Sequence, residues 1–132
     1  MTQESFELEC DRLSHVVDAT QFERLRWART EGPMLARLVA LLHSALDGRE
    51  DFELTEEGTT GAVRRFILKV HSNRVMAVMI RLEPGRAVVA AEEIERSRYK
   101  LADPRPISDD FDVIDEQWMA SALQQLFQRV HQ

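Results

Sequence analysis

The hydrophobic pattern of this chain changes its period at Gly48, and that change limits the fold more than any other feature. Before Gly48, apolar residues recur at spacings of three and four, the pattern of helices that bury one face. After Gly48, apolar and polar residues alternate, which is typical of strands with one buried face. The sequence therefore predicts an α+β fold with helices first and strands second.

Two or three helices are expected before Gly48. The first has one apolar stripe, in which the cysteine is expected to be a small buried hydrophobe. This stripe consists of Phe6, Cys10, Leu13 and Val17. Asp18, followed by Gln21, resembles a helix-capping signal, so either a bend or a second short helix follows. Gly32-Pro33 should begin the most buried helix, which Gly48 ends.

Four strands are expected after Gly48, joined by short turns into an antiparallel β-meander. They lie near residues 52–55, 65–71, 75–82 and 86–91, with turns at 57–61, 72–73 and 84–85. Residues 92–100 fit either a helical turn or a prolonged strand, and 103–106 form a proline-rich linker within the domain. Asp115 should cap an amphipathic C-terminal helix. The whole chain, residues 1–132, is predicted to form a single domain.

The third predicted strand is apolar on both faces, which requires cover on both sides of the sheet. A domain of this size has few helices with which to supply that cover. A second copy or another protein would provide it. The expected interface residues lie on this strand and on the last helix: Val75, Ala77, Met79, Trp118 and Met119.

Composition excludes several classes of protein. A net charge of −6 disfavours nucleic-acid binding, although the arginines between Arg24 and Arg37 leave a local basic patch as a third hypothesis. A single cysteine allows no intrachain disulfide and fits a reducing compartment. The acidic N-terminus is unlike a secretory signal, and no apolar stretch is long enough for a membrane span, so a cytoplasmic location is expected.

No catalytic residue, metal site or cofactor is expected. The acids between Asp109 and Glu116 do not match a calcium loop, and the four histidines lack ligand spacing. Serine- and cysteine-hydrolase signatures do not occur. Three neighbouring residues, Arg65, Lys69 and His71, could hold an anion at the end of the second strand.

The expected function is a non-enzymatic protein-interaction module that associates with itself or with a protein partner. Small accessory, chaperone-like and regulatory subunits belong to this class. The alternative is a small-molecule binding domain or enzyme, with an anionic ligand held in a pocket between helix and sheet. The absence of catalytic signatures and the apolar surplus favour the first hypothesis.

Overall fold

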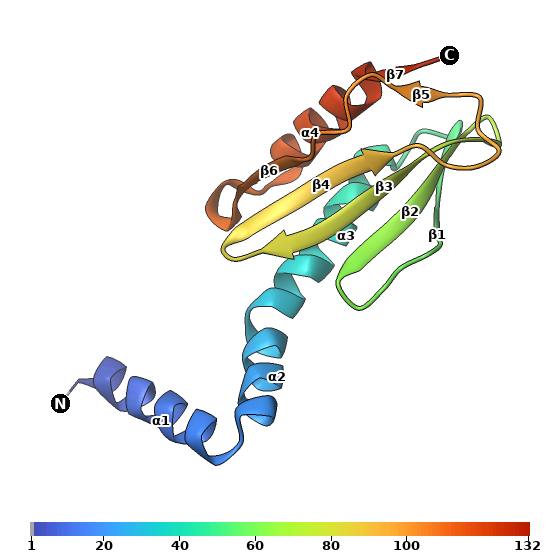
Figure 1. The fold of residues 1–132 in the computed structure, drawn as a ribbon. Coiled ribbons are helices and arrows are strands. Elements are labelled where there is room, and N and C mark those ends of the chain that lie inside the picture. Colours follow the sequence, from blue (N-terminus) through green and yellow to red (C-terminus); the bar gives the residue numbers. More distant parts are fainter. Residues whose placement is uncertain (1) are drawn as a thin grey trace. The chain divides into compact units, whose positions relative to one another are not determined.

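The computed structural model describes residues 2–132 (Figure 1). It consists of a first compact unit, which ends at Met34, and a second unit, from Leu35 to Gln132. The boundary lies within helix α3 (Glu31–Leu46). Among the described residues, every buried hydrophobic side chain lies between Leu35 and Leu126. The second unit therefore holds the hydrophobic core.

The first unit begins with a pair of helices, α1 (Gln3–Val17) and α2 (Ala19–Arg29). The Thr2 side chain caps α1 by accepting a hydrogen bond of 3.1 Å from the Ser5 backbone N–H. Asp18 caps α2 in the same way through the N–H of Gln21, also at 3.1 Å. The predicted capping signal at Asp18 is confirmed, and it separates two helices.

Helix α3 begins at Glu31, one residue before the predicted start at Gly32-Pro33. A Cβ at position 32 would lie 2.9 Å from the Cζ3 of Trp27, so glycine permits the indole to approach this turn. The helix ends at Leu46. Gly48 follows with a φ of +87°, the left-handed conformation that often terminates helices, as predicted.

Neither α1 nor α2 contains a buried residue. The prediction that Cys10 is buried is therefore wrong, since its side chain is exposed. An amphipathic spacing shows which side of a helix is apolar, but burial also requires an element that covers that side. Helix α2 has only 11 residues and does not bury the α1 stripe.

The second unit is built on a five-stranded antiparallel sheet in the order β1-β2-β3-β4-β6. The strands are β1 (Phe52–Glu56), β2 (Val63–Val70), β3 (Asn73–Glu83), β4 (Arg86–Glu92) and β6 (Ile107–Asp110). The α+β class is confirmed, and β1 to β4 form the predicted meander. The expected four strands omitted β6, whose polar sequence ISDD gives little strand signal. Strand β6 pairs with β4, and Arg86 and Asp110 form an ion pair of 2.9 Å between them.

The turns differ from the predictions by small shifts. His71 and Ser72, rather than residues 72–73, form the β2–β3 turn, with φ values of 50° and 65° that suit a tight hairpin. Gly85 has a φ of 69°, so the predicted turn at Pro84-Gly85 is confirmed. Residues 93–99 are neither helix nor strand. They turn at Arg96, after which the Ser97 hydroxyl donates to the Val75 carbonyl at 2.7 Å.

The C-terminal segment contains short elements and one long helix. A 3-10 turn, η1 (Phe111–Val113), precedes α4 (Glu116–Gln128). Asp115 caps α4 through the Trp118 N–H at 2.7 Å, as predicted. Two-residue strands β5 (Lys100–Leu101) and β7 (Val130–His131) pair with each other and tie the chain end to the β4–β6 connection.

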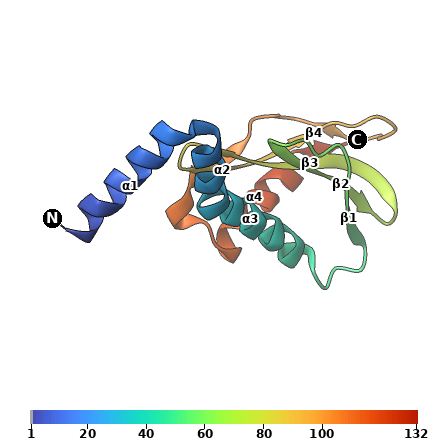
Figure 2. The same cartoon turned by 90° about the horizontal axis from the view of Figure 1, so that it is seen from below.

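Within the second unit, α4 and the second-unit part of α3 cover the same face of the sheet (Figure 2). The Phe66 ring of β2 lies 5.4 Å from His43 of α3, and the Phe52 ring of β1 lies 5.8 Å from Phe127 of α4. The apolar side chains of this layer interdigitate as a close-packed core. Its largest fully buried members include Leu38, Leu42, Phe66, Met76, Ile80, Met119 and Leu126.

On the opposite face of the sheet, two long polar side chains meet across the central strand. Arg65 on β2 donates from Nε to Glu92 on β4 at 2.8 Å, and β3 lies between these strands. Their register partners on β3 are Met79 and Ala77, so this ion pair crosses the central strand. Ala77 on this face is completely buried. Ala77 on the second face of β3 is thus buried within one chain, whereas Met79 on the same face is half-buried, and cover by a partner remains a prediction.

Candidate interaction surface

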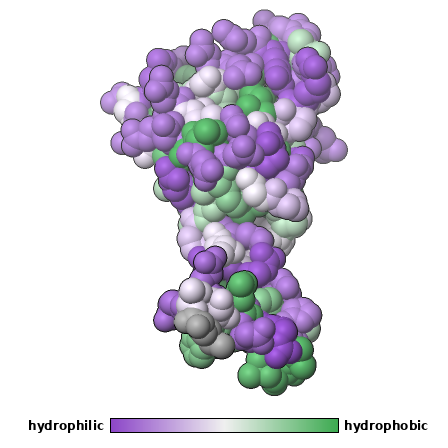
Figure 3. All heavy atoms as spheres, turned by 90° about the vertical axis from the view of Figure 1, so that its left-hand side faces the viewer, coloured by the Kyte–Doolittle hydropathy of each residue, from purple (hydrophilic) through white to green (hydrophobic). Residues whose placement is uncertain are grey.

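The first unit exposes most of the large apolar side chains that are open to solvent. Of the eight exposed large hydrophobic residues among residues 2–132, only Val113 lies in the second unit. Exposed fractions in the first unit range from 43% for Trp27 to 76% for Val17. Figure 3 shows hydrophobic side chains on the surface of the N-terminal helices. We call this set the hairpin surface: Phe6, Leu8, Leu13, Val16, Val17, Leu25 and Trp27.

A groove of about 450 Å³ runs between α1 and α2. Near the turn between the helices, His15 and Phe22 pack edge to face with ring centroids 5.4 Å apart. Away from the turn, the helices leave an open channel with polar and apolar walls. Its lining consists of Glu7, Cys10, Asp11 and Ser14 from α1 and Phe22, Leu25, Arg26, Arg29 and Thr30 from α2 and the residue after it.

The two helices have opposite net charges. Helix α1 contains four acidic residues and one arginine, which gives −3, whereas α2 contains one acidic residue and three arginines, which gives +2. Arg26 is already paired with Glu23 at 3.0 Å and with Glu31 at 3.1 Å, and these contacts raise the pKa of its guanidinium. Among the described residues, Asp11 and Arg29 form no intrachain ion pair.

The arginines considered as a nucleic-acid patch belong to two units. Arg24, Arg26 and Arg29 belong to α2 in the first unit. Arg37, in the second unit, donates from Nη2 to the Ile114 carbonyl at 2.7 Å and holds the segment that leads into α4. Its guanidinium therefore has a structural contact.

The residues predicted to hold an anion lie along one strand and its turn. Arg65 and Lys69 share a face of β2 and are four residues apart, which corresponds to about 13 Å between their Cα atoms. His71 lies in the turn, and its backbone N–H donates to the Asp51 carbonyl at 2.8 Å. Arg65 is committed to Glu92 and also donates from Nη1 to the Glu57 carbonyl at 3.1 Å. The three side chains do not converge on one described cavity, and anion binding there remains a prediction.

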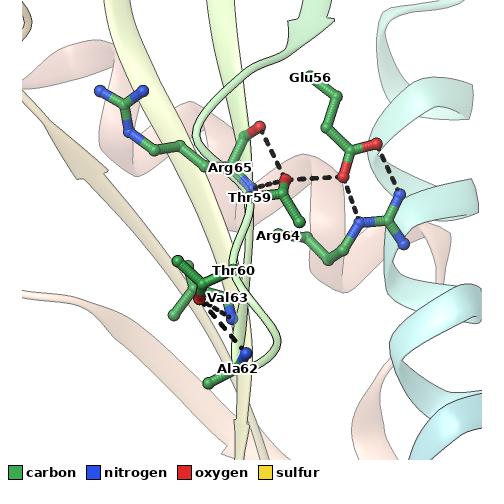
Figure 4. A network of polar contacts seen from close by, with 7 residues as sticks. All are labelled: Glu56, Thr59, Thr60, Ala62, Val63, Arg64 and Arg65. Carbon is green, nitrogen blue, oxygen red and sulfur yellow. Dashed lines mark hydrogen bonds and ion pairs between the residues drawn. The ribbon is translucent and has the colours of Figure 1, made fainter.

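A polar network next to Arg65 orders the loop between β1 and β2 (Figure 4). Arg64 donates from Nη2 to Glu56 at 2.8 Å, and the Thr59 hydroxyl donates to the same carboxylate at 2.7 Å. The Arg64 hydrogen bond, followed by that from Thr59, lowers the pKa of Glu56 from 4.5 to about 2. Thr59 also accepts a hydrogen bond of 3.0 Å from the Arg65 N–H. These contacts fix a loop conformation.

Three of the five residues predicted to form an interface are buried in the second unit. Ala77 and Met119 are completely buried, and Val75 is 7% exposed. Met79 and Trp118 are half-buried, and the Trp118 indole N–H donates to Asp109 at 3.3 Å. In the single chain, Met79 and Trp118 are partly open to a partner, whereas the other three side chains are buried. Their part in an interface remains a prediction.

Three of the acidic residues near the start of α4 have separate partners. Asp109 accepts from Trp118, Asp110 pairs with Arg86, and Asp115 caps the helix. Within residues 2–132, no group of three or more histidine, cysteine or acidic residues is arranged to hold a metal ion.

The hollow between α4 and the sheet is apolar. It has a volume of about 230 Å³ and is lined by Phe52, Leu68, Val70, Val75, Tyr99, Phe127 and Val130. A charged ligand would lose its hydration there without gaining an opposite charge. This hollow does not match the anionic ligand of the alternative hypothesis.

Among the described residues, no helix is long and apolar enough to cross a membrane. The chain matches no family model, curated protein or solved structure with which it was compared. The candidate site therefore rests on the residues themselves.

Sequence reasoning identified the apolar stripe of α1 but not the hairpin surface. Phe6, Leu13 and Val17 belong to that stripe, and Leu25 continues an apolar face in the next segment, but Leu8 and Val16 lie outside both. One signal could have revealed the surface: residues 19–29 contain only three large apolar side chains, Phe22, Leu25 and Trp27, too few to cover a neighbouring helix.

Proposed function

We propose that this protein is a non-enzymatic protein-interaction module in which the second unit is the folded scaffold and the α1–α2 pair is the docking element. One observation supports the proposal most strongly: α1 and α2 contain no buried residue and carry seven of the eight exposed large hydrophobic side chains among residues 2–132. Large apolar side chains exposed together on one pair of helices favour a protein–protein contact.

Energetics support the same proposal. Burying a single Leu, Val or Phe side chain contributes about 1.5–3 kcal/mol, so covering the hairpin surface would release a substantial free energy. Helices of 15 and 11 residues gain little stability in water from their own hydrogen bonds. A partner would therefore both cover the apolar residues and stabilise the helices.

The proposal includes a cytoplasmic location. Cys10 is the only cysteine in the sequence, and its thiol is exposed. In an oxidising compartment, an exposed unpaired thiol is open to oxidation and intermolecular disulfide formation, whereas a reducing compartment keeps it free.

Site-specific photocrosslinking in cells tests the interaction role. A photoreactive phenylalanine analogue is placed at Leu13 in α1, and the matched control carries it at Glu95, an exposed position in the second unit. Irradiation should give a discrete adduct from position 13 and none from position 95. An adduct with the mass of two chains or with a different protein would each support the module. No adduct at position 13, or equal adducts at both positions, would contradict it.

A further inference from the structure

We infer that the partner of the α1–α2 pair is a second copy of this chain, with the acidic α1 of each copy against the basic α2 of the other. The inference rests on the proposed function, because it names the occupant of the docking element. The opposite net charges of the two helices, −3 and +2, indicate which helix of one copy contacts which helix of the other.

In a two-fold dimer, this charge difference makes the two copies complementary to each other. In a two-fold dimer, a contact from one copy to the other occurs twice, with the roles of the copies exchanged. A contact of α1 with the partner's α2 therefore brings unlike charges together at two places. A contact of α1 with α1, or of α2 with α2, would place like charges together and is disfavoured.

The charges that would make these contacts lie along the groove. Glu7 and Asp11 project from the α1 wall, and Arg26 and Arg29 from the α2 wall. Arg29 and Asp11 form no ion pair within the described chain, so their charges are open to a partner. Arg26 is shared with Glu23 and Glu31, and its side chain is still 48% exposed.

The apolar residues give the same arrangement its binding energy. Phe6, Leu13 and Val17 share one stripe of α1, and Leu25 and Trp27 are exposed on α2. Two helix pairs packed together form a four-helix arrangement, in which apolar faces meet in the centre and charges lie at the margins. Helix α1, with 15 residues, is only about 22 Å long. The interface is small, so association should depend on protein concentration.

Other occupants fit the charge pattern less well. An anionic membrane surface or a nucleic acid would attract the arginines of α2 but would be repelled by the acids of α1. A foreign peptide of one sign would complement only one of the two helices. A second copy complements both.

Charge reversal in the full chain tests the inference. One variant, E7K/D11K, makes α1 basic, and another, R26E/R29E, makes α2 acidic. Each variant alone would place like charges at both contacts, whereas a mixture of the two would restore unlike charges at both. The control, E50K/E95K, makes the same change in net charge as E7K/D11K at exposed positions of the second unit.

Sedimentation velocity is measured for wild type, each variant and the equimolar mixture. We expect wild type and E50K/E95K to dimerise, each groove variant to dimerise at least about tenfold more weakly, and the mixture to recover dimers. Dimerisation of wild type should also weaken in about 1 M NaCl, where the screening length falls to about 3 Å. Circular dichroism of each variant reports helix content, and a folding defect would persist in the mixture.

Three results would overturn the inference. These are a wild-type protein that remains monomeric at every concentration, groove variants that dimerise as well as wild type, and a mixture that stays monomeric. A monomeric wild type together with a photocrosslink from Leu13 to another protein would contradict self-association but support the interaction module. A monomeric wild type with no crosslink would contradict both proposals.

Discussion

Arg65 and Glu92 form an ion pair that crosses the central strand of the sheet, because Arg65 lies on β2, Glu92 on β4, and β3 runs between them. The guanidinium donates from Nε at 2.8 Å, and the pair lies on the sheet face that no helix of the second unit covers. The pair lies over the second face of β3, where Ala77 is completely buried in the single chain.

Replacing Arg65 should therefore test packing separately from charge. Arg65→Ala removes the aliphatic cover and should lower the free energy of unfolding by about 1–3 kcal/mol, whereas Arg65→Met keeps most of the stem and should cost less. Urea unfolding of both variants measures the difference. Equal losses in the two variants would show that the ion pair, and not the cover, provides the stability.

The position of the core predicts that the two units respond differently to truncation. Leu38 is completely buried in the second unit, so Leu38→Ala should lower the free energy of unfolding by about 2–5 kcal/mol. Leu13 is 57% exposed in the first unit, so Leu13→Ala should change it by less than about 0.5 kcal/mol in dilute solution. Thermal unfolding of dilute samples checks both values. A large loss for Leu13→Ala would contradict the assignment of the core.

Glu56 should contribute to the acid sensitivity of the second unit. Its pKa is lowered from 4.5 to about 2 in the folded protein, chiefly by the hydrogen bond from Arg64. A lowered pKa stabilises the fold above pH 4.5, and this contribution is lost as the pH falls from 4.5 towards about 2. Glu56→Gln cannot titrate, so its free energy of unfolding should fall less steeply than that of wild type over this interval. Parallel curves for the two proteins would exclude the contribution.

Cys10 provides a chemical probe of the groove. The thiol is exposed in the single chain and lines the channel between α1 and α2, where a second copy would cover it. Its rate of alkylation by a maleimide should therefore decrease as protein concentration rises. In R26E/R29E the rate should stay constant over the same range. A wild-type rate that does not depend on concentration would count against a partner in this groove.

The sequence was sufficient to predict the elements that depend on local signals. Asp18 and Asp115 cap helices because a side-chain oxygen can accept a hydrogen bond from a nearby backbone N–H. Gly85 forms a turn because glycine adopts the positive φ that this turn requires. The alternation in β1 and β2 and the short turns between the strands predicted the meander. Each of these signals lies within a few residues of the structure that it specifies.

Features that depend on distant residues could not be read in the same way. Strand β6 is polar and pairs only because β4 presents a free edge, with Arg86 placed opposite Asp110. The burial of Ala77 under a side-chain pair from two other strands depends on the register of the whole sheet. The α1 stripe is exposed because α2 does not cover it. The hairpin surface could therefore be recognised only after the fold was known.

The measurement that most directly tests the account is the molar mass of the full chain in solution, compared with that of L13E/V17E. The chain has a mass of 15.3 kDa. Sedimentation equilibrium at high concentration should give twice this mass for wild type and the single-chain mass for the variant, because two buried glutamates would oppose the apolar contact. A variant that keeps the doubled mass, or a wild type that never exceeds the single-chain mass, would contradict self-association through the hairpin surface.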